Sequence, residues 1–204
     1  MVAVLTGDII NSGKNKDIKW LDALKVLLNT IGKSPKDWAI YRGDEFQILI
    51  KNPDDALLTA IHIKAILKQT KGLDARISIG IGTIESYKGK ILEASGAAFI
   101  QSGRTFEELR KNKISLKVNS NDHQIDEELN LYLQLALTGF IDKWSPASAE
   151  MVAIMLSAGK TSQDELAQKT GIAQSAISQR LKRANFDLIM QINDIYKKKI
   201  KSLA

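Results

Sequence analysis

The first 120 residues alternate between short apolar runs and longer stretches in which apolar residues recur at helical spacing. The strand-like runs are residues 2–6, 38–41, 46–50 and 75–82. The stretches with helical spacing are residues 18–31 and 54–70. The pattern therefore predicts the order βαββαβ, with a further helix over 91–111 and a further strand over 114–118.

The order βαββαβ is typical of a ferredoxin-like α/β sandwich, in which both helices cover one face of an antiparallel sheet. Beyond it, the polar and turn-rich segment 117–126 indicates a domain boundary. Everything after this boundary has helical spacing. The predicted fold class is therefore α+β, with a ferredoxin-like domain followed by an all-α domain.

Three segments follow from this division. Residues 1–120 form the predicted ferredoxin-like domain, and residues 144–204 form the predicted all-α domain. Between them, residues 121–143 form a leucine-rich connecting helix that is apolar around most of its circumference. Such a helix is expected to be buried between the domains or in a dimer interface.

The all-α segment has the pattern of a helix-turn-helix. Ser162 and Glu165 have the spacing of a capping box at the start of one helix, and Gly171 supplies the left-handed turn after it. The next helix begins near Gln174. Four apolar residues of this helix are predicted to face inward, namely Ile177, Leu181, Ala184 and Leu188.

The outward face of this last helix is polar and basic. Four uncharged residues lie on its first turns, where this motif meets base edges: Gln174, Ser175, Ser178 and Gln179. Three basic residues can meet phosphates: Arg180, Lys182 and Arg183. The alternative is an ordinary helical hairpin without DNA. The apolar series continues to Ile192 and Ile195. These residues either form a dimer interface or pack the last helix on its own domain.

Composition narrows the classes of function. Of the 204 residues, 44% are apolar and 25% charged, and no run of about 18 apolar residues could span a membrane. The first residues do not have the pattern of a signal peptide, so a cytoplasmic protein is expected. The chain has no cysteine and two separated histidines, which makes a zinc site unexpected. The net charge of +6 lies mostly in 141–204, which suits duplex DNA as partner.

Two carboxylates are predicted to meet at one edge of the sheet. Asp8 ends the first strand and Asp44 begins the third, and these strands are neighbours in the predicted order. Paired aspartates at strand ends can hold Mg²⁺ or Mn²⁺, with phosphate oxygens completing the shell. In the alternative, each aspartate caps a neighbouring turn.

Four segments resemble the core of class III nucleotidyl cyclases and of GGDEF domains: TGDIINS (6–12), YRGDEFQIL (41–49), ISIGIG (77–82) and SGAAFIQSGR (95–104). The resemblance implies that Asp8 and Asp44 are metal ligands and that Arg42, Gly43 and Arg104 lie near a nucleotide, with Arg104 the one candidate catalytic group.

Two positions depart from the patterns of these families. Ile100 stands in place of the cyclase asparagine, and Arg42 stands in place of the first glycine of GGDEF domains. Both departures speak against turnover. In GGDEF domains the glycine lets the base of the substrate approach the hairpin. An isoleucine cannot hold a ribose or developing charge, and losing such a polar donor costs about 10²–10³ in rate.

The chain also resembles the SatD family in both halves, through TGDI and RGDEFQ near the start and GIAQSAISQRLKRA (171–184) near the end. The resemblance implies a DNA-binding regulator with a cyclase-like domain. Because Asp8, Asp44 and Arg104 are retained while Ile100 replaces the asparagine, we expect this domain to sense a nucleotide or metal-phosphate ligand. Two alternatives stay open. One is a metal-dependent nucleotidyl transferase or cyclase, and the other is an interaction protein that never meets DNA.

Overall fold

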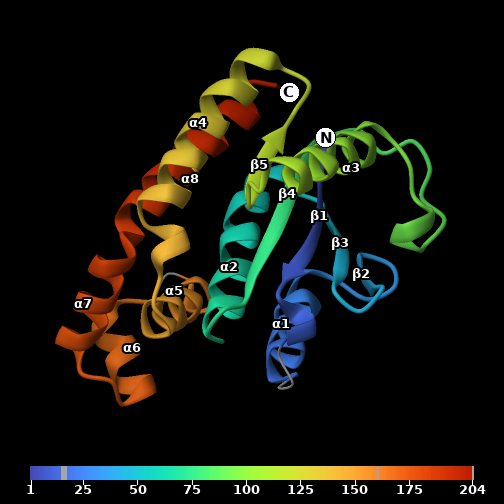
Figure 1. The fold of residues 1–204 in the computed structure, drawn as a ribbon. Coiled ribbons are helices and arrows are strands. Elements are labelled where there is room, and N and C mark those ends of the chain that lie inside the picture. Colours follow the sequence, from blue (N-terminus) through green and yellow to red (C-terminus); the bar gives the residue numbers. More distant parts are fainter. Residues whose placement is uncertain (15–17, 160, 204) are drawn as a thin grey trace.

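The structure is a computed structural model that describes residues 1–14, 18–159 and 161–203. In this part it is a mixed α+β protein with one five-stranded sheet and eight α-helices (Figure 1). The strands are β1 (Val2–Ile10), β2 (Trp38–Tyr41), β3 (Glu45–Ile50), β4 (Asp74–Gly82) and β5 (Leu116–Asn119). The helices are α1 (Lys19–Ile31), α2 (Ala56–Lys68), α3 (Ala97–Asn112), α4 (His123–Gly139), α5 (Pro146–Ala158), α6 (Gln163–Thr170), α7 (Gln174–Ala184) and α8 (Phe186–Lys201).

The sheet has the strand order β2-β3-β1-β4-β5. β1 is antiparallel to both of its neighbours, β2 is antiparallel to β3, and β5 runs parallel to β4. The mixed α+β class and a strand at each predicted run are confirmed. The helix predicted over 91–111 begins only at Ala97, and a short 3-10 turn (Ile91–Glu93) precedes it.

The two faces of the sheet differ in chemistry because side chains alternate along each strand. One face presents apolar residues such as Leu5 and Ile79 to α1 and α2. The other face is covered by α3 and carries small and polar residues together with Val4 and Leu49, which belong to a second, smaller apolar cluster. A Cβ atom at Gly80 would collide with the backbone of Ala98 and Ser102, so glycine allows α3 to approach the sheet closely.

Helix α2 is the most enclosed helix of the fold. The sheet covers one side of it, and α5 and α8 pack against the other. Its buried residues include a lysine, Lys64, which is fully inaccessible. One continuous apolar core runs from Ala3 in β1 to Ile200 in α8, so the C-terminal helices pack directly on the sheet domain.

Helix α4, by contrast, is buried on one face only. Leu129 and Leu133 lie in the core, while Leu131 and Leu135 are 55% and 60% exposed. Within this chain α4 therefore covers the main core with one face and leaves the apolar residues Leu131 and Leu135 of the other face exposed, so burial in a dimer interface stays a prediction. The α4 side chain of Asn130 also pairs with the edge strand β5, accepting from the N–H of Val118 and donating to its carbonyl oxygen, both at 2.8 Å.

The last two helices are separated by a sharp turn. Helix α7 ends at Ala184, and Asn185 has the left-handed φ of 53° that stops the helix. Leu188, predicted to face inward, is 45% exposed because this turn changes the direction of the chain. Ile192 and Ile195 are partly buried against the main core, which α8 shares with α2, α4 and the sheet.

Candidate functional site

Helices α5, α6 and α7 form a compact three-helix unit. It has a small apolar cluster of its own, made of the buried side chains of Met151, Leu166, Ile177 and Leu181. Helix α7 packs mainly on α5, and α6 lies against α7. The unit is attached to the rest of the chain through α5, which packs on α2.

Local hydrogen bonds fix both ends of α6. The N–H of Glu165 donates to Ser162 Oγ at 3.2 Å, and Ser162 N–H donates to Glu165 Oε2 at 2.9 Å. This is the predicted capping box. At the other end Gly171 has a φ of 70°, the left-handed conformation that favours glycine. Residues 163–184 therefore form two helices, α6 and α7, joined by a short turn.

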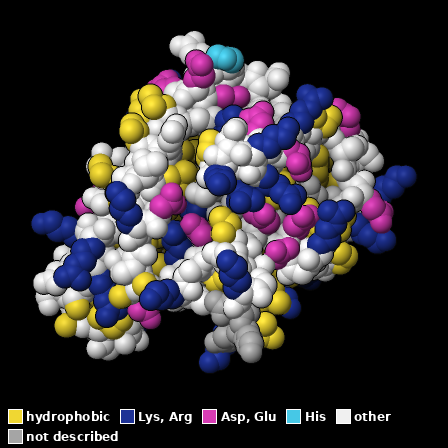
Figure 2. All heavy atoms as spheres, in the orientation of Figure 1, with side chains coloured by type: hydrophobic (Ala, Val, Ile, Leu, Met, Phe, Trp, Pro, Cys, Tyr) yellow, Lys and Arg dark blue, Asp and Glu magenta, His cyan; other side chains and the backbone are white. Residues whose placement is uncertain are grey.

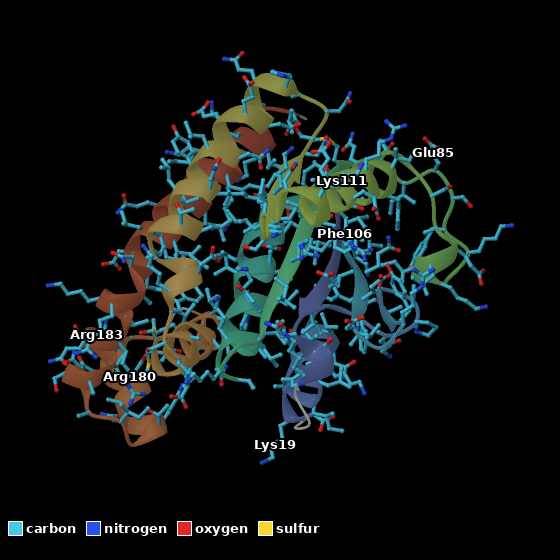
Figure 3. All side chains as sticks on the ribbon, in the orientation of Figure 1. Lys19, Glu85, Phe106, Lys111, Arg180 and Arg183 are labelled. Atoms are coloured by element: carbon cyan, nitrogen blue, oxygen red, sulfur yellow. The ribbon has the colours of Figure 1, made fainter. Side chains whose placement is uncertain are left out.

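The outward face of α7 carries the predicted polar and basic residues. Six of them are exposed, namely Gln174, Ser175, Ser178, Gln179, Lys182 and Arg183. Arg180 differs, because it is half-buried and its Nη1 lies 3.3 Å from Glu150 Oε2 on α5. Figure 3 labels Arg180 and Arg183 on this helix, and Figure 2 shows basic side chains over the region of α6 and α7.

A second group of charged side chains lies on the face of the sheet that α3 covers. The strand register places Asp8 between Glu45 on β3 and Arg76 on β4. Arg76 Nη1 donates to Asp8 Oδ2 at 2.9 Å, and Ser12 Oγ donates to Asp44 Oδ2 at 2.8 Å. The two predicted metal-binding aspartates therefore each have a donor from the protein.

Glu45 links this group to the hairpin and to α3. Its carboxylate lies 3.7 Å from Arg42 Nη1 and 3.9 Å from Arg110 Nη1. Arg110 in turn lies over the ring of Phe106, 5.8 Å from its centroid, and Phe106 is on the sheet side of α3 (Figure 3). Burial raises the pKa of Asp8, opposed by Arg76 and Arg110 and reinforced by Asp44 and Glu45.

In the present arrangement both aspartates are engaged by groups of the protein. A guanidinium already neutralises Asp8, and a hydroxyl engages Asp44. Among the described residues, no three His, Cys, Asp or Glu side chains are grouped so that they could hold a metal. The one feature that suits a ligand is Asp8 Oδ1, a buried oxygen without a hydrogen-bond partner.

Of the three candidate nucleotide-binding residues, Arg42 and Gly43 lie together in one hairpin, and Arg104 lies on α3. Arg42 and Gly43 form the tip of the β2–β3 hairpin with φ values of 52° and 89°, so Arg42 adopts a conformation that glycine favours. Arg104 is exposed on the outer side of α3, as is Ile100, whereas Ser102 and Phe106 face the sheet. Within one chain, Arg104 and Asp8 are on opposite sides of α3.

Sequence reasoning did not find four residues of this group: Ser12, Glu45, Arg76 and Arg110. A signal existed for Arg76, because pairing the predicted strands 2–6 and 75–82 in antiparallel register brings it beside Asp8. Arg110 gave no comparable signal, since its position depends on how α3 crosses the sheet.

These features define a sheet-based α+β protein that carries a three-helix unit with an exposed polar and basic helix. The family model described as the SatD family matches residues 1–202, and the chain belongs to that family. Neither the curated proteins nor the solved structures contained a match to the chain. Within residues 1–14, 18–159 and 161–203, every helix is too short or too polar to cross a membrane.

Proposed function

We propose that the chain is a transcription regulator that binds duplex DNA through α5, α6 and α7, a helix-turn-helix. The observation that carries this proposal is the exposed face of α7, where amide and hydroxyl side chains on the first turns are followed by Lys182 and Arg183. In such a unit the second helix of the motif enters the major groove with its N-terminal residues at the bases. Basic residues on later turns then meet phosphates.

The N-terminal domain is proposed to be ferredoxin-like and similar to nucleotidyl cyclases. The antiparallel order β2-β3-β1-β4 supports this assignment. Its proposed role is sensing a nucleotide or metal ligand, for which Asp8 and Asp44 stay the candidate metal ligands for Mg²⁺ or Mn²⁺. Because Arg76 holds Asp8, a cation would have to displace this guanidinium.

Fluorescence anisotropy with a labelled duplex of mixed sequence tests the DNA proposal. Binding should weaken steeply as salt rises, because each phosphate contact releases counterions. The double variant Lys182→Gln, Arg183→Gln should weaken binding and reduce the slope of log affinity against log salt by about 2. The protein should keep its stability, since both side chains are exposed.

The matched control is Lys25→Gln on α1, which removes an exposed charge from a distant helix. Its affinity for DNA should equal that of the wild type. Equal losses in Lys25→Gln and in the α7 variant would show that only net charge matters. If the protein binds no DNA even at low salt, it is better described as an interaction protein that does not meet DNA, which is the other alternative raised by the sequence.

A second candidate is a metal-dependent nucleotidyl transferase or cyclase with a DNA-binding module. The unpartnered Oδ1 of Asp8, close enough to Asp44 for their charges to interact, favours it. If this candidate is right, the protein forms a product from ATP or GTP only when Mg²⁺ or Mn²⁺ is present, and Asp44→Ala abolishes product formation. The separation of Arg104 from Asp8 means that a second copy of the chain would have to supply Arg104, so the proposed homodimer should be tested by sedimentation.

A further inference from the structure

A hollow lies where the sheet domain meets the three-helix unit, between the end of β1, the C-terminal end of α2 and the start of α5. Its volume is about 350 Å³, and its walls include Lys68, Lys71, Asp142 and Trp144. A smaller hollow of about 220 Å³ adjoins it, shares Lys71 and adds Lys14. In Figure 1 this is the region where the end of α2 lies beside α5.

Three donors engage the carboxylate of Asp74 in one wall of this hollow. Lys64 Nζ donates to Asp74 Oδ1 at 2.7 Å, Lys68 Nζ lies 3.0 Å from Oδ2, and the N–H of Ala75 donates to Oδ1 at 2.7 Å. Lys64 is fully buried and Lys68 is nearly so. Two lysines therefore share one carboxylate, and burial lowers the pKa of Lys64. Lys68 is the member of this pair that lines the hollow.

The rim of the two hollows adds further positive charge. Lys14 and Lys71 are exposed, and neither has an ion-pair partner among the residues that the structure describes. Asn11 holds the rim in place, since its Nδ2 donates to the carbonyl oxygen of Gly72 at 2.8 Å. Two carboxylates oppose this charge among the described lining residues. That of Asp74 is engaged by Lys64 and Lys68, and that of Asp142 is exposed, while the backbone oxygen of Asp142 accepts from Lys68 at 3.2 Å.

Trp144 connects this place to the DNA-binding unit. Its side chain is almost completely buried and forms one wall of the larger hollow. Its indole Nε1–H donates to the carbonyl oxygen of Ala184, the last residue of α7, at 3.0 Å. A molecule that presses on Trp144 would therefore act directly on the end of the helix proposed to meet DNA.

We propose that this junction hollow binds a small molecule bearing a phosphate group, held by Lys68, Lys71 and Lys14. The volume suits a phosphate ester of a few carbon atoms. Lys71 and Lys14 have no ion-pair partner in the described part of the chain and can supply the charge-assisted donors that a phosphate needs, while Lys68 already contacts Asp74. Binding of this molecule to the hollow does not depend on the proposed DNA-binding function. Its expected effect on DNA affinity, transmitted through Trp144, rests on that proposed function.

Calorimetry on the full chain at constant ionic strength tests the site, with inorganic phosphate, pyrophosphate and glycerol 3-phosphate as probes and chloride as the reference anion. Saturable binding of at least one phosphate probe is expected. Tighter binding of glycerol 3-phosphate would identify an ester as the ligand class, and tighter binding of the inorganic ions would identify free phosphate. Lys71→Gln should weaken binding about tenfold, since a hydrogen bond to a charged group is lost.

The matched control is again Lys25→Gln, which should bind the probes like the wild type. The absence of saturable binding by any probe overturns the proposal. An unchanged affinity of Lys71→Gln for the probes also overturns it. An equal loss of affinity in Lys25→Gln does the same, because it would indicate a general effect of charge.

Trp144→Phe separates the site from its effect on DNA, because it keeps an aromatic wall but removes the indole donor. In this variant the phosphate probe should still bind, while its influence on anisotropy with duplex DNA should disappear. If the wild type binds the probe but no DNA under any condition, the proposed function fails and the site stands. If DNA binding is normal and no probe binds, the site fails and the proposed function stands.

Discussion

Arg76 and Asp8 face each other across the β1–β4 pair, with Nη1 of the arginine 2.9 Å from Oδ2 of the aspartate. Both side chains are about one-fifth exposed, at 18% and 19%. An arginine thus occupies the side of the carboxylate that a cation would need. This ion pair joins two neighbouring strands of the sheet, so we expect it to contribute to stability.

Removing Arg76 should destabilise the protein through Asp8. Arg76→Gln leaves a largely buried carboxylate without its partner, so the free energy of unfolding should fall by about 1–3 kcal/mol at pH 7. Asp8→Asn in the same chain should restore most of this loss, because it removes the unpaired charge. Urea denaturation of the two single variants and the double variant measures the coupling. Simple additivity of the two single effects would contradict this pairing.

Acidification should weaken the contact between α2 and α5. His62 is 8% exposed, its Nε2 lies 3.2 Å from Ser157 Oγ on α5, and burial lowers its pKa below the ordinary value of 6.5. Below pH 6.5 the unfolded chain binds a proton that the folded chain resists, so the free energy of unfolding should fall as the pH drops through 6.5 towards the folded pKa.

The dependence on His62 can be isolated with the second histidine. His62→Gln should flatten the pH profile of stability between pH 7 and 5, when urea denaturation is followed at each pH. His123→Gln, at a side chain that is 86% exposed, should leave the slope unchanged. A profile that stays steep in His62→Gln would assign the pH dependence to other groups.

The small core of the three-helix unit should be the weak point of that unit. Ile177 is fully buried beside Met151, Leu166 and Leu181, and Ile177→Ala should cost about 2–5 kcal/mol. Amide exchange should quicken in α5 to α7 and stay slow in the sheet, since this cluster is separate from the main core. The surface variant Ser175→Ala on the same helix should change stability by less than about 0.5 kcal/mol. Uniform loss of protection throughout the sheet would argue against a separate unit.

Asn193 should be a destabilising residue of α8. Its side chain is fully buried, and neither its Oδ1 nor its Nδ2 has a hydrogen-bond partner in the described part of the chain. Asn193→Leu replaces this amide by an apolar side chain of similar length, so the free energy of unfolding should rise by about 1–2 kcal/mol. Thermal and urea unfolding would measure the gain. A large loss instead would mean that the amide makes a hydrogen bond in solution.

Much of the chain's local structure could be predicted from its sequence, because the causes are local. The capping box of Ser162 and Glu165 spans three residues, and the left-handed turn at Gly171 depends on one residue. The order of strands and helices follows from hydrophobic periodicity in the same way. The placement of Asp8 beside the start of β3 also followed, since antiparallel pairing of two recognised strands fixes it.

A local signal was missed at Asn185. The series Ile177, Leu181, Ala184 and Leu188 keeps helical spacing through a residue that ends the helix, so periodicity alone placed Leu188 inside. Asparagine tolerates the left-handed conformation better than most residues, and this preference was the available warning. Periodicity describes a continuous helix, and it carries no information about where the backbone turns.

Other features were decided only by the tertiary structure. The bond between Trp144 and Ala184, the enclosure of α2 by α5 and α8, and the charge of Arg110 near Glu45 each join segments far apart in the chain. The sequence by itself determined which segments are helices and strands and which of their faces are apolar. It could not determine which apolar faces meet, because many pairings of helices and strands bury a similar area. The choice among these pairings depends on how side chains fit across each contact, and no local pattern specifies that fit.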